Sequence, residues 1–181
     1  MVRSTHVVFV LAFVLSVVSG EALAHTPNAL ADGGLMAGFL HPFGGFDHLA
    51  ATLAVGAWIA RLERQALVIV PVAILAALGA GLVTGLEGFP VSAEAGIIAS
   101  LVVLAAALLF DLRPIPIVAA AAAGFFAFFH GHAHGAEIPA LADPTTYAAG
   151  LGIASAQLMI LGAILARRGI GHDRLKAAPR T

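Results

Sequence analysis

Residues 66–86 read ALVIVPVAILAALGAGLVTGL, a run of 21 residues without a charged side chain. A bilayer core of about 30 Å needs close to 20 helical residues, so this run is long enough to cross a membrane as one helix. Further apolar segments of spanning length lie at about 46–62, 93–110, 115–134 and 145–166. The sequence therefore predicts an all-α polytopic membrane protein, built as a bundle of five transmembrane helices.

The composition of the whole chain agrees with this class. The 181 residues are 60% hydrophobic and 10% charged, and the mean hydropathy is +0.99, whereas soluble domains carry about 25% charged residues. The length allows one membrane helical domain, predicted over residues 25–168, and no appended soluble module. The net charge of −1 says nothing about nucleic acid, and no basic patch suggests it, so no nucleic-acid partner is expected. The absence of cysteine excludes disulfides and thiolate metal sites.

The N-terminus has the pattern of a cleavable signal peptide over residues 1–24. Arg3 supplies the positive charge, residues 7–18 form the apolar region, and residues 22–24 (Ala-Leu-Ala) form the cleavage pattern. An uncleaved first helix is the alternative. Cleavage would make His25 the first mature residue, either a flexible terminal residue or a metal ligand that chelates together with the new α-amine.

A short helix is expected before the first spanning segment. Residues 33–40 are too few to cross a bilayer, and Pro42 biases His41 away from helix, so we expect the helix to end there. With Gly44 and Gly45 following, the pattern predicts a re-entrant or interfacial helix that breaks and then continues as the first span. Broken helices beside ionisable residues are typical of transporter binding sites.

Basic residues define the orientation of the predicted bundle. With the N-terminus outside, five spans place the C-terminus inside, and residues 169–181 form a cytoplasmic tail. Every basic residue after the signal peptide then lies on the cytoplasmic side, as the positive-inside rule requires: Arg61, Arg64, Arg113, Arg167, Arg168, Arg174, Lys176 and Arg180. Most acidic residues fall at the outer mouth, which would attract cations.

Three histidines and a carboxylate close the segment at 115–134. His130 and His134 are four residues apart and Glu137 follows three later, so all three share one helix face. Two imidazoles one turn apart can bind one metal ion. His132 points elsewhere, and either coordinates from the helix end or supports a ligand. In the alternative interpretation, these histidines form hydrogen bonds with neighbouring helices.

A second cluster lies at the predicted helix break. His41 and His48 are seven residues apart, and whether they share a face depends on the geometry of the break. Asp47 could ligate a metal, orient an imidazole or cap the helix N-terminus. Glu94, at the start of a helix, is either a further ligand or a surface residue favoured by the helix dipole.

Small and hydroxyl-bearing residues predict close packing between helices. Gly131 and Gly135 are four residues apart, a spacing that lets another helix approach closely. Hydrogen bonds between helices are expected from four hydroxyl side chains: Thr52, Thr84, Ser100 and Ser155.

The chain resembles the HupE/UreJ family of small bacterial membrane proteins. The resemblance rests on the stretch from His41 to His48, on residues 55–56 and 94–97, and on residues 129–137 (FHGHAHGAE). It implies a secondary permease of the inner membrane for nickel or cobalt, which supplies hydrogenase or urease maturation. It also implies that transport depends on His41, Asp47, His48, His130 and His134. One departure is residues 157–159 (Gln-Leu-Met), where a histidine is expected in many relatives.

Three function classes follow from these motifs. The first is a transporter for a divalent metal, whose direct energy source is not ATP because the chain lacks a Walker loop. The second is an intramembrane zinc-dependent hydrolase, with Asp47 or Glu137 as general base. The third is a non-transporting metal-binding membrane subunit. In each class the metal is bound without a prosthetic group, membrane lipid surrounds the bundle, and a homo-oligomer is left open.

Overall fold

Every regular element in the part of the chain that the structure describes is an α-helix. The computed structural model describes residues 34–44, 46–139 and 142–177, and the side chains of residues 46, 47 and 169–177 are outside this description. The helices are α2 (Leu35–Gly44), α3 (Phe46–Ile59), α4 (Ala66–Leu86), α5 (Ala93–Leu109), α6 (Pro116–Ala136) and α7 (Pro144–Ala177). The predicted all-α architecture is confirmed. The predicted signal peptide and His25 lie outside the described residues.

Three helices are long and apolar enough to cross a membrane: α4, α6 and the Pro144–Arg168 part of α7. Their lengths follow from long apolar runs that contain no charged side chain before the helix ends. The apolar parts of α3 and α5 are shorter, spanning His48–Ile59 and Ala93–Leu109. The count of five spans therefore stays a prediction.

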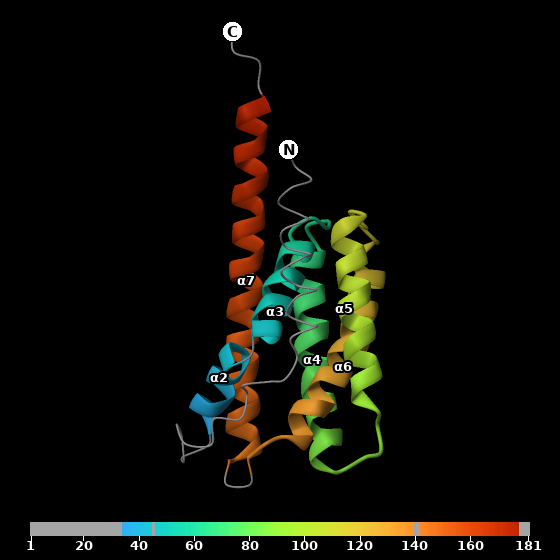
Figure 1. Ribbon diagram of the computed structural model, residues 1–181, viewed down its shortest axis with the longest axis vertical. Helices are drawn as coiled ribbons and strands as arrows, with labels where there is room; N and C mark the ends of the chain where they lie inside the picture. Colours follow the sequence, from blue (N-terminus) through green and yellow to red (C-terminus); the bar gives the residue numbers. More distant parts are fainter. Residues whose placement is uncertain (1–33, 45, 140–141, 178–181) are drawn as a thin grey trace.

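The helices form two groups (Figure 1). In the first, which we call the α7 group, α2 and α3 pack one after the other along α7; in the second, the α6 group, α4 and α5 pack against α6. Contacts within each group are much more extensive than contacts between the groups. The interface between the groups runs along the length of the bundle.

Glycines bring α4 and α6 into backbone contact. Gly81 and Gly85 of α4 and Gly131 and Gly135 of α6 each lie so close to the facing helix that a Cβ would overlap its backbone carbonyl oxygens. Small residues four apart allow this approach, and the tight packing replaces the hydrophobic drive that lipid cannot supply. The close approach predicted for Gly131 and Gly135 is confirmed.

The predicted break between α2 and α3 differs in one detail from the structure. α2 continues through Pro42 and ends at Gly44, whereas we expected it to end at His41. Proline removes one backbone hydrogen bond near the end of a short helix. Gly38 and Pro42 are the buried residues of α2, and Gly38 touches the α7 backbone at Tyr147, so packing outweighs the local bias of proline.

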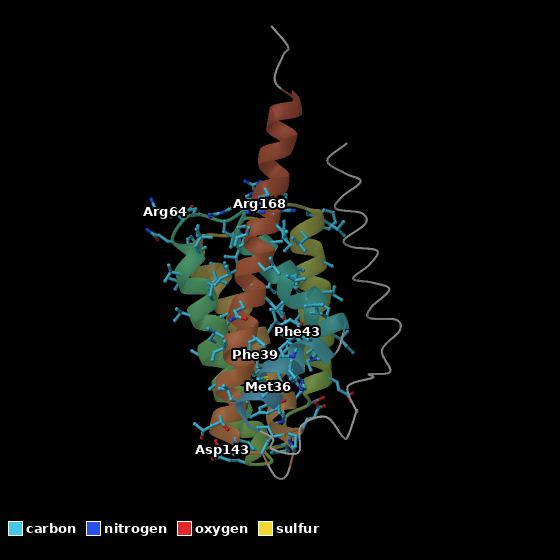
Figure 2. All side chains as sticks on the ribbon, turned by 90° about the vertical axis from the view of Figure 1, so that its left-hand side faces the viewer. Met36, Phe39, Phe43, Arg64, Asp143 and Arg168 are labelled. Atoms are coloured by element: carbon cyan, nitrogen blue, oxygen red, sulfur yellow. The ribbon has the colours of Figure 1, made fainter. Side chains whose placement is uncertain are left out.

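The two ends of the bundle differ in chemistry. Arg64 and Arg168 lie at one end and Asp143 at the other (Figure 2). A core of buried side chains fills the end that carries the arginines, and it joins α3, α4, α5, α6 and α7. Its members are Trp58, Ile59, Ala66, Val70, Ala107, Ala119, Ala120 and Met159. The histidine motifs are placed toward the opposite end.

Candidate metal centre

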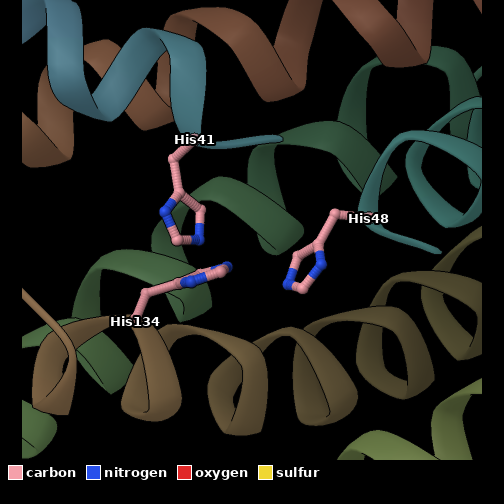
Figure 3. Close-up of side chains that lie close together, drawn as sticks. All are labelled: His41, His48 and His134. Atoms are coloured by element: carbon pink, nitrogen blue, oxygen red, sulfur yellow. The ribbon is translucent and has the colours of Figure 1, made fainter. Parts of the chain in front are cut away.

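Three imidazoles from three helices meet inside the bundle. His41 of α2, His48 of α3 and His134 of α6 each offer one ring nitrogen, and these atoms lie within 4.8 Å of one another. Figure 3 shows the three rings facing a common point. The ring centroids of His134 are 4.6 Å from His41 and 5.4 Å from His48. We call this set the histidine cluster.

The helix break positions two members of the cluster. His41 lies in the last turn of α2 and His48 near the start of α3, and their ring centroids are 5.7 Å apart. Sequence spacing alone left open whether they share a face. The two helices on either side of Gly45 direct both rings toward α6, so the break assembles the site.

The spacing of the cluster suits a divalent transition metal. For three atoms that lie within 4.8 Å of one another, a common point exists no more than about 2.8 Å from each, and metal–imidazole bonds are about 2.0–2.1 Å long. Inward shifts of at most roughly 0.7 Å at each ring would therefore complete the coordination. Imidazole is a ligand that suits nickel, copper, iron and zinc.

His134 is the most enclosed member of the cluster. Its side chain is 5% exposed, and its Nδ1 has no hydrogen-bond partner among the described residues. Burying an unsatisfied polar atom costs about 1–3 kcal/mol. Tyr147 lies beside the cluster, with its ring centroid 6.0 Å from that of His41. A metal ion bound at the cluster would take one ring nitrogen of His134 as a ligand.

A cavity of about 280 Å³ extends from the cluster along the interface between the two groups. His48, His130, His134 and Glu137 line it near one end, and Trp58 lines it farther along α3. Most other lining residues are apolar. The shared face predicted for His130, His134 and Glu137 therefore looks into one cavity, and Glu137 itself is exposed at the helix end.

His130 lines the cavity and is held from α5. Its Nε2 lies 2.9 Å from Ser100 Oγ, and Ser100 Oγ donates to the backbone oxygen of Ile97 at 2.6 Å. A hydroxyl has one proton, so Ser100 accepts the proton of His130 Nε2. The structure thus groups His134 with His41 and His48, while His130 lines the same cavity and pairs with Ser100.

His132 faces a different neighbour. Its Nδ1 lies 3.1 Å from Thr84 Oγ1, and Thr84 donates to the backbone oxygen of Gly81 at 2.7 Å. This contact lies in the glycine-lined interface of α4 and α6, and it matches the interpretation of interhelical hydrogen bonding. The hydrogen bonds predicted for Thr84 and Ser100 are both present.

The remaining predicted site residues lie elsewhere. Glu94 is exposed in the first turn of α5 and does not line the cavity. The side chain of Asp47 is outside the description, as is all of His25. Two residues escaped the sequence reasoning, Trp58 and Tyr147, although they are the single tryptophan and single tyrosine of the chain. Their polar-tipped rings within apolar helices were the available signal.

Fold and site together define a helical membrane protein whose interior holds an imidazole cluster with metal-ligand spacing. The chain belongs to the HupE/UreJ family: the family model described as HupE / UreJ protein matches residues 11–178. It is also 37% identical over 159 residues to Protein HupE of Rhizobium leguminosarum bv. viciae, covering 87% of this chain and 83% of that protein. The resemblance seen in the motifs is therefore confirmed. No solved structure gives a significant match to the chain.

Proposed function

We propose that this protein is a secondary transporter that carries a divalent transition metal, nickel first and cobalt second, from the periplasm to the cytoplasm. The observation that carries the proposal is the histidine cluster, at which one ligand of the α6 group meets two of the α7 group beside an internal cavity. Membership in the HupE/UreJ family supports a transporter-type protein and not an enzyme. The cargo would serve the maturation of a hydrogenase or urease.

The ligand chemistry supports a cargo of this kind. Three imidazoles bind as neutral ligands, so the site attracts a transition metal more strongly than it attracts calcium or magnesium, which prefer oxygen. A small inward movement of the rings, of at most roughly 0.7 Å each, brings the ligand nitrogens to bonding distance. A site that closes around its ion and reopens is suited to transient binding.

The charge distribution supports a direction. Arg64 and Arg168 lie at the end opposite Asp143 (Figure 2), and basic loops prefer the cytoplasm. We therefore place the histidine end toward the periplasm and the arginine end in the cytoplasm of a bacterial inner-membrane protein. In this arrangement α3, α4, α5, α6 and α7 are the five spans, residues 1–24 are a cleaved signal peptide, and residues 169–181 form the tail.

Metal flux into proteoliposomes tests the proposal. The full chain should accumulate nickel or cobalt, and His134→Ala should abolish accumulation because it removes the buried ligand of the cluster. His172→Ala is the matched histidine control, since this residue lies beyond the predicted spans, and it should transport as the wild type does. Both variants are compared at equal reconstituted amounts.

Other outcomes of the same experiment overturn the proposal. Tight stoichiometric binding without flux identifies a non-transporting metal-binding subunit. Zinc-dependent turnover of lipid or peptide without flux identifies an intramembrane hydrolase. Equal flux through the wild type and His134→Ala shows that the histidine cluster is not on the transport route.

A further inference from the structure

The end of the bundle that carries the arginines is closed by one side chain of α3 and one from the turn that follows it. Trp58 Nε1 donates to the backbone oxygen of Leu112 at 3.0 Å, and Arg61 donates to the backbone oxygen of Leu108 at 3.3 Å. Arg61 also forms an ion pair with Asp111 at 3.5 Å. The acceptors lie at the end of α5 and in the connection to α6. Trp58 therefore joins the α7 group to the α6 group, and Arg61 fixes the connection between α3 and α4 against the end of α5.

Trp58 separates the cavity from this end. It lines the cavity, and only 8% of its surface is exposed. It also packs in the apolar core with Ala107 and Met159, which line the same cavity. An ion that moved from the histidine cluster toward the arginine end would therefore meet the indole ring of Trp58 and the side chains packed around it.

The two ends of the group interface hold together by different means. At one end the imidazoles of His41 and His48 face the imidazole of His134 across the interface, and a metal ion bound by all three would draw the two helix groups together. At the other end, the groups are joined by the apolar core around Trp58, by the hydrogen bonds of Trp58 and Arg61 to backbone oxygens, and by the ion pair of Arg61 with Asp111. Each of these hydrogen bonds contributes modestly and breaks reversibly. Transporters commonly expose a fixed central site by rocking one helix group against another.

We propose that Trp58 and Arg61 form a latch with residues 108–112, and that its release separates the two helix groups at the arginine end and opens the cavity there. The proposal deepens the transport function stated above and rests on it. The latch is the inner gate for the metal ion. When the latch is closed, the indole ring of Trp58 blocks the cavity at the arginine end. When the latch is open, the ion can pass Met159 toward that end.

Thiol labelling tests the latch without any metal. The chain contains no cysteine, so Met159→Cys places a single thiol in the cavity beside Trp58. A charged, membrane-impermeant methanethiosulfonate reagent is added to membrane vesicles from the side that carries Arg61. Labelling of Met159→Cys alone should be slow. Adding Trp58→Phe, which keeps an aromatic ring and removes the N–H donor, should accelerate labelling roughly fivefold.

Arg61→Met in the same background removes the second donor, keeps an unbranched apolar stem, and should give a similar acceleration. Arg113→Met is the matched control: Arg113 pairs with the same Asp111 at 2.6 Å, but both belong to one connection and do not join the two groups. It should leave the labelling rate unchanged. Circular dichroism and size-exclusion elution identify any variant that fails to fold. If either Trp58→Phe or Arg61→Met fails to fold, the labelling rate of the other variant tests the latch.

Unchanged labelling in Trp58→Phe and Arg61→Met overturns the latch, as does an equal acceleration in Arg113→Met. These results are distinct from a failure of the proposed function. If labelling accelerates as expected but the protein carries no metal flux, the latch is supported and the transport function is refuted. If metal flux is observed but labelling is unchanged, transport is supported and this gate is refuted.

Discussion

Replacing His134 by leucine separates the metal-binding role of this residue from its effect on the fold. The side chain is 5% exposed, and its Nδ1 has no hydrogen-bond partner among the described residues. An unsatisfied buried polar atom costs about 1–3 kcal/mol. Leucine has a similar size and no polar atom, so metal-free His134→Leu should be as stable as the wild type or more stable, by up to roughly 2 kcal/mol.

The same substitution should remove the stabilisation that metal provides. A ligand present at 100 times its Kd stabilises a folded protein by about 2.7 kcal/mol. With His41 and His48 alone, the cluster loses its most enclosed ligand, and we expect the gain at the same metal concentration to fall below about 1 kcal/mol. Unfolding in mixed micelles of dodecylmaltoside and dodecyl sulfate, with and without nickel, measures both quantities.

His132→Leu is the matched control for this experiment. His132 is on the same helix and 6% exposed, but its Nδ1 contacts Thr84 and not the cluster. Its replacement should cost about 1 kcal/mol of metal-free stability and leave the metal-dependent gain intact. The reasoning is refuted if metal-free His134→Leu is less stable than the wild type by more than 1 kcal/mol, or if it keeps the full response to nickel.

Three further changes have defined outcomes. Gly135→Val should destabilise the bundle by roughly 1–3 kcal/mol in the same unfolding assay, because a Cβ there overlaps the backbone oxygen of Leu82. Nickel affinity, measured by titration calorimetry, should fall more than about tenfold between roughly pH 7.5 and 5.5, since imidazoles bind metal only when neutral. Asp143→Ala should flatten the fall in melting temperature upon acidification. Hydrogen bonds from Thr146 hold the pKa of Asp143 below its usual value. The ionised carboxylate therefore stabilises the folded protein fully above the pKa that Asp143 has in the unfolded chain. This stabilisation is lost as the pH falls through the lower pKa of the folded state.

Helix positions were largely accessible from the sequence. Long runs without charge, such as residues 66–86, specify helices because a backbone in an apolar environment must satisfy its hydrogen bonds within the segment. The spacing of Gly131 and Gly135 likewise predicted a close helix contact, because residues four apart lie on one face. Pro42 is the exception, since its local bias against helix was outweighed by the packing of α2 on α7.

The composition of the site was accessible only in part. Sequence spacing correctly placed His130, His134 and Glu137 on one face, and that face does line the cavity. It could not show that His134 meets His41 and His48 while His130 bonds to Ser100. Which imidazoles meet depends on the rotation and height of α6 relative to α2 and α3, and residues far apart in the chain determine both.

The sequence by itself determined the helical class of the protein, the family, and the histidines from which a metal site could be built, because apolar length, residue spacing and motif are local properties of the chain. Only the tertiary structure decided how these parts combine. It divided the helices into two groups, selected three imidazoles for one cluster, turned His132 toward Thr84 and placed Trp58 and Arg61 across the far end. These outcomes depend on close backbone packing at glycines, which sets the distances between helices and therefore decides which side chains can meet.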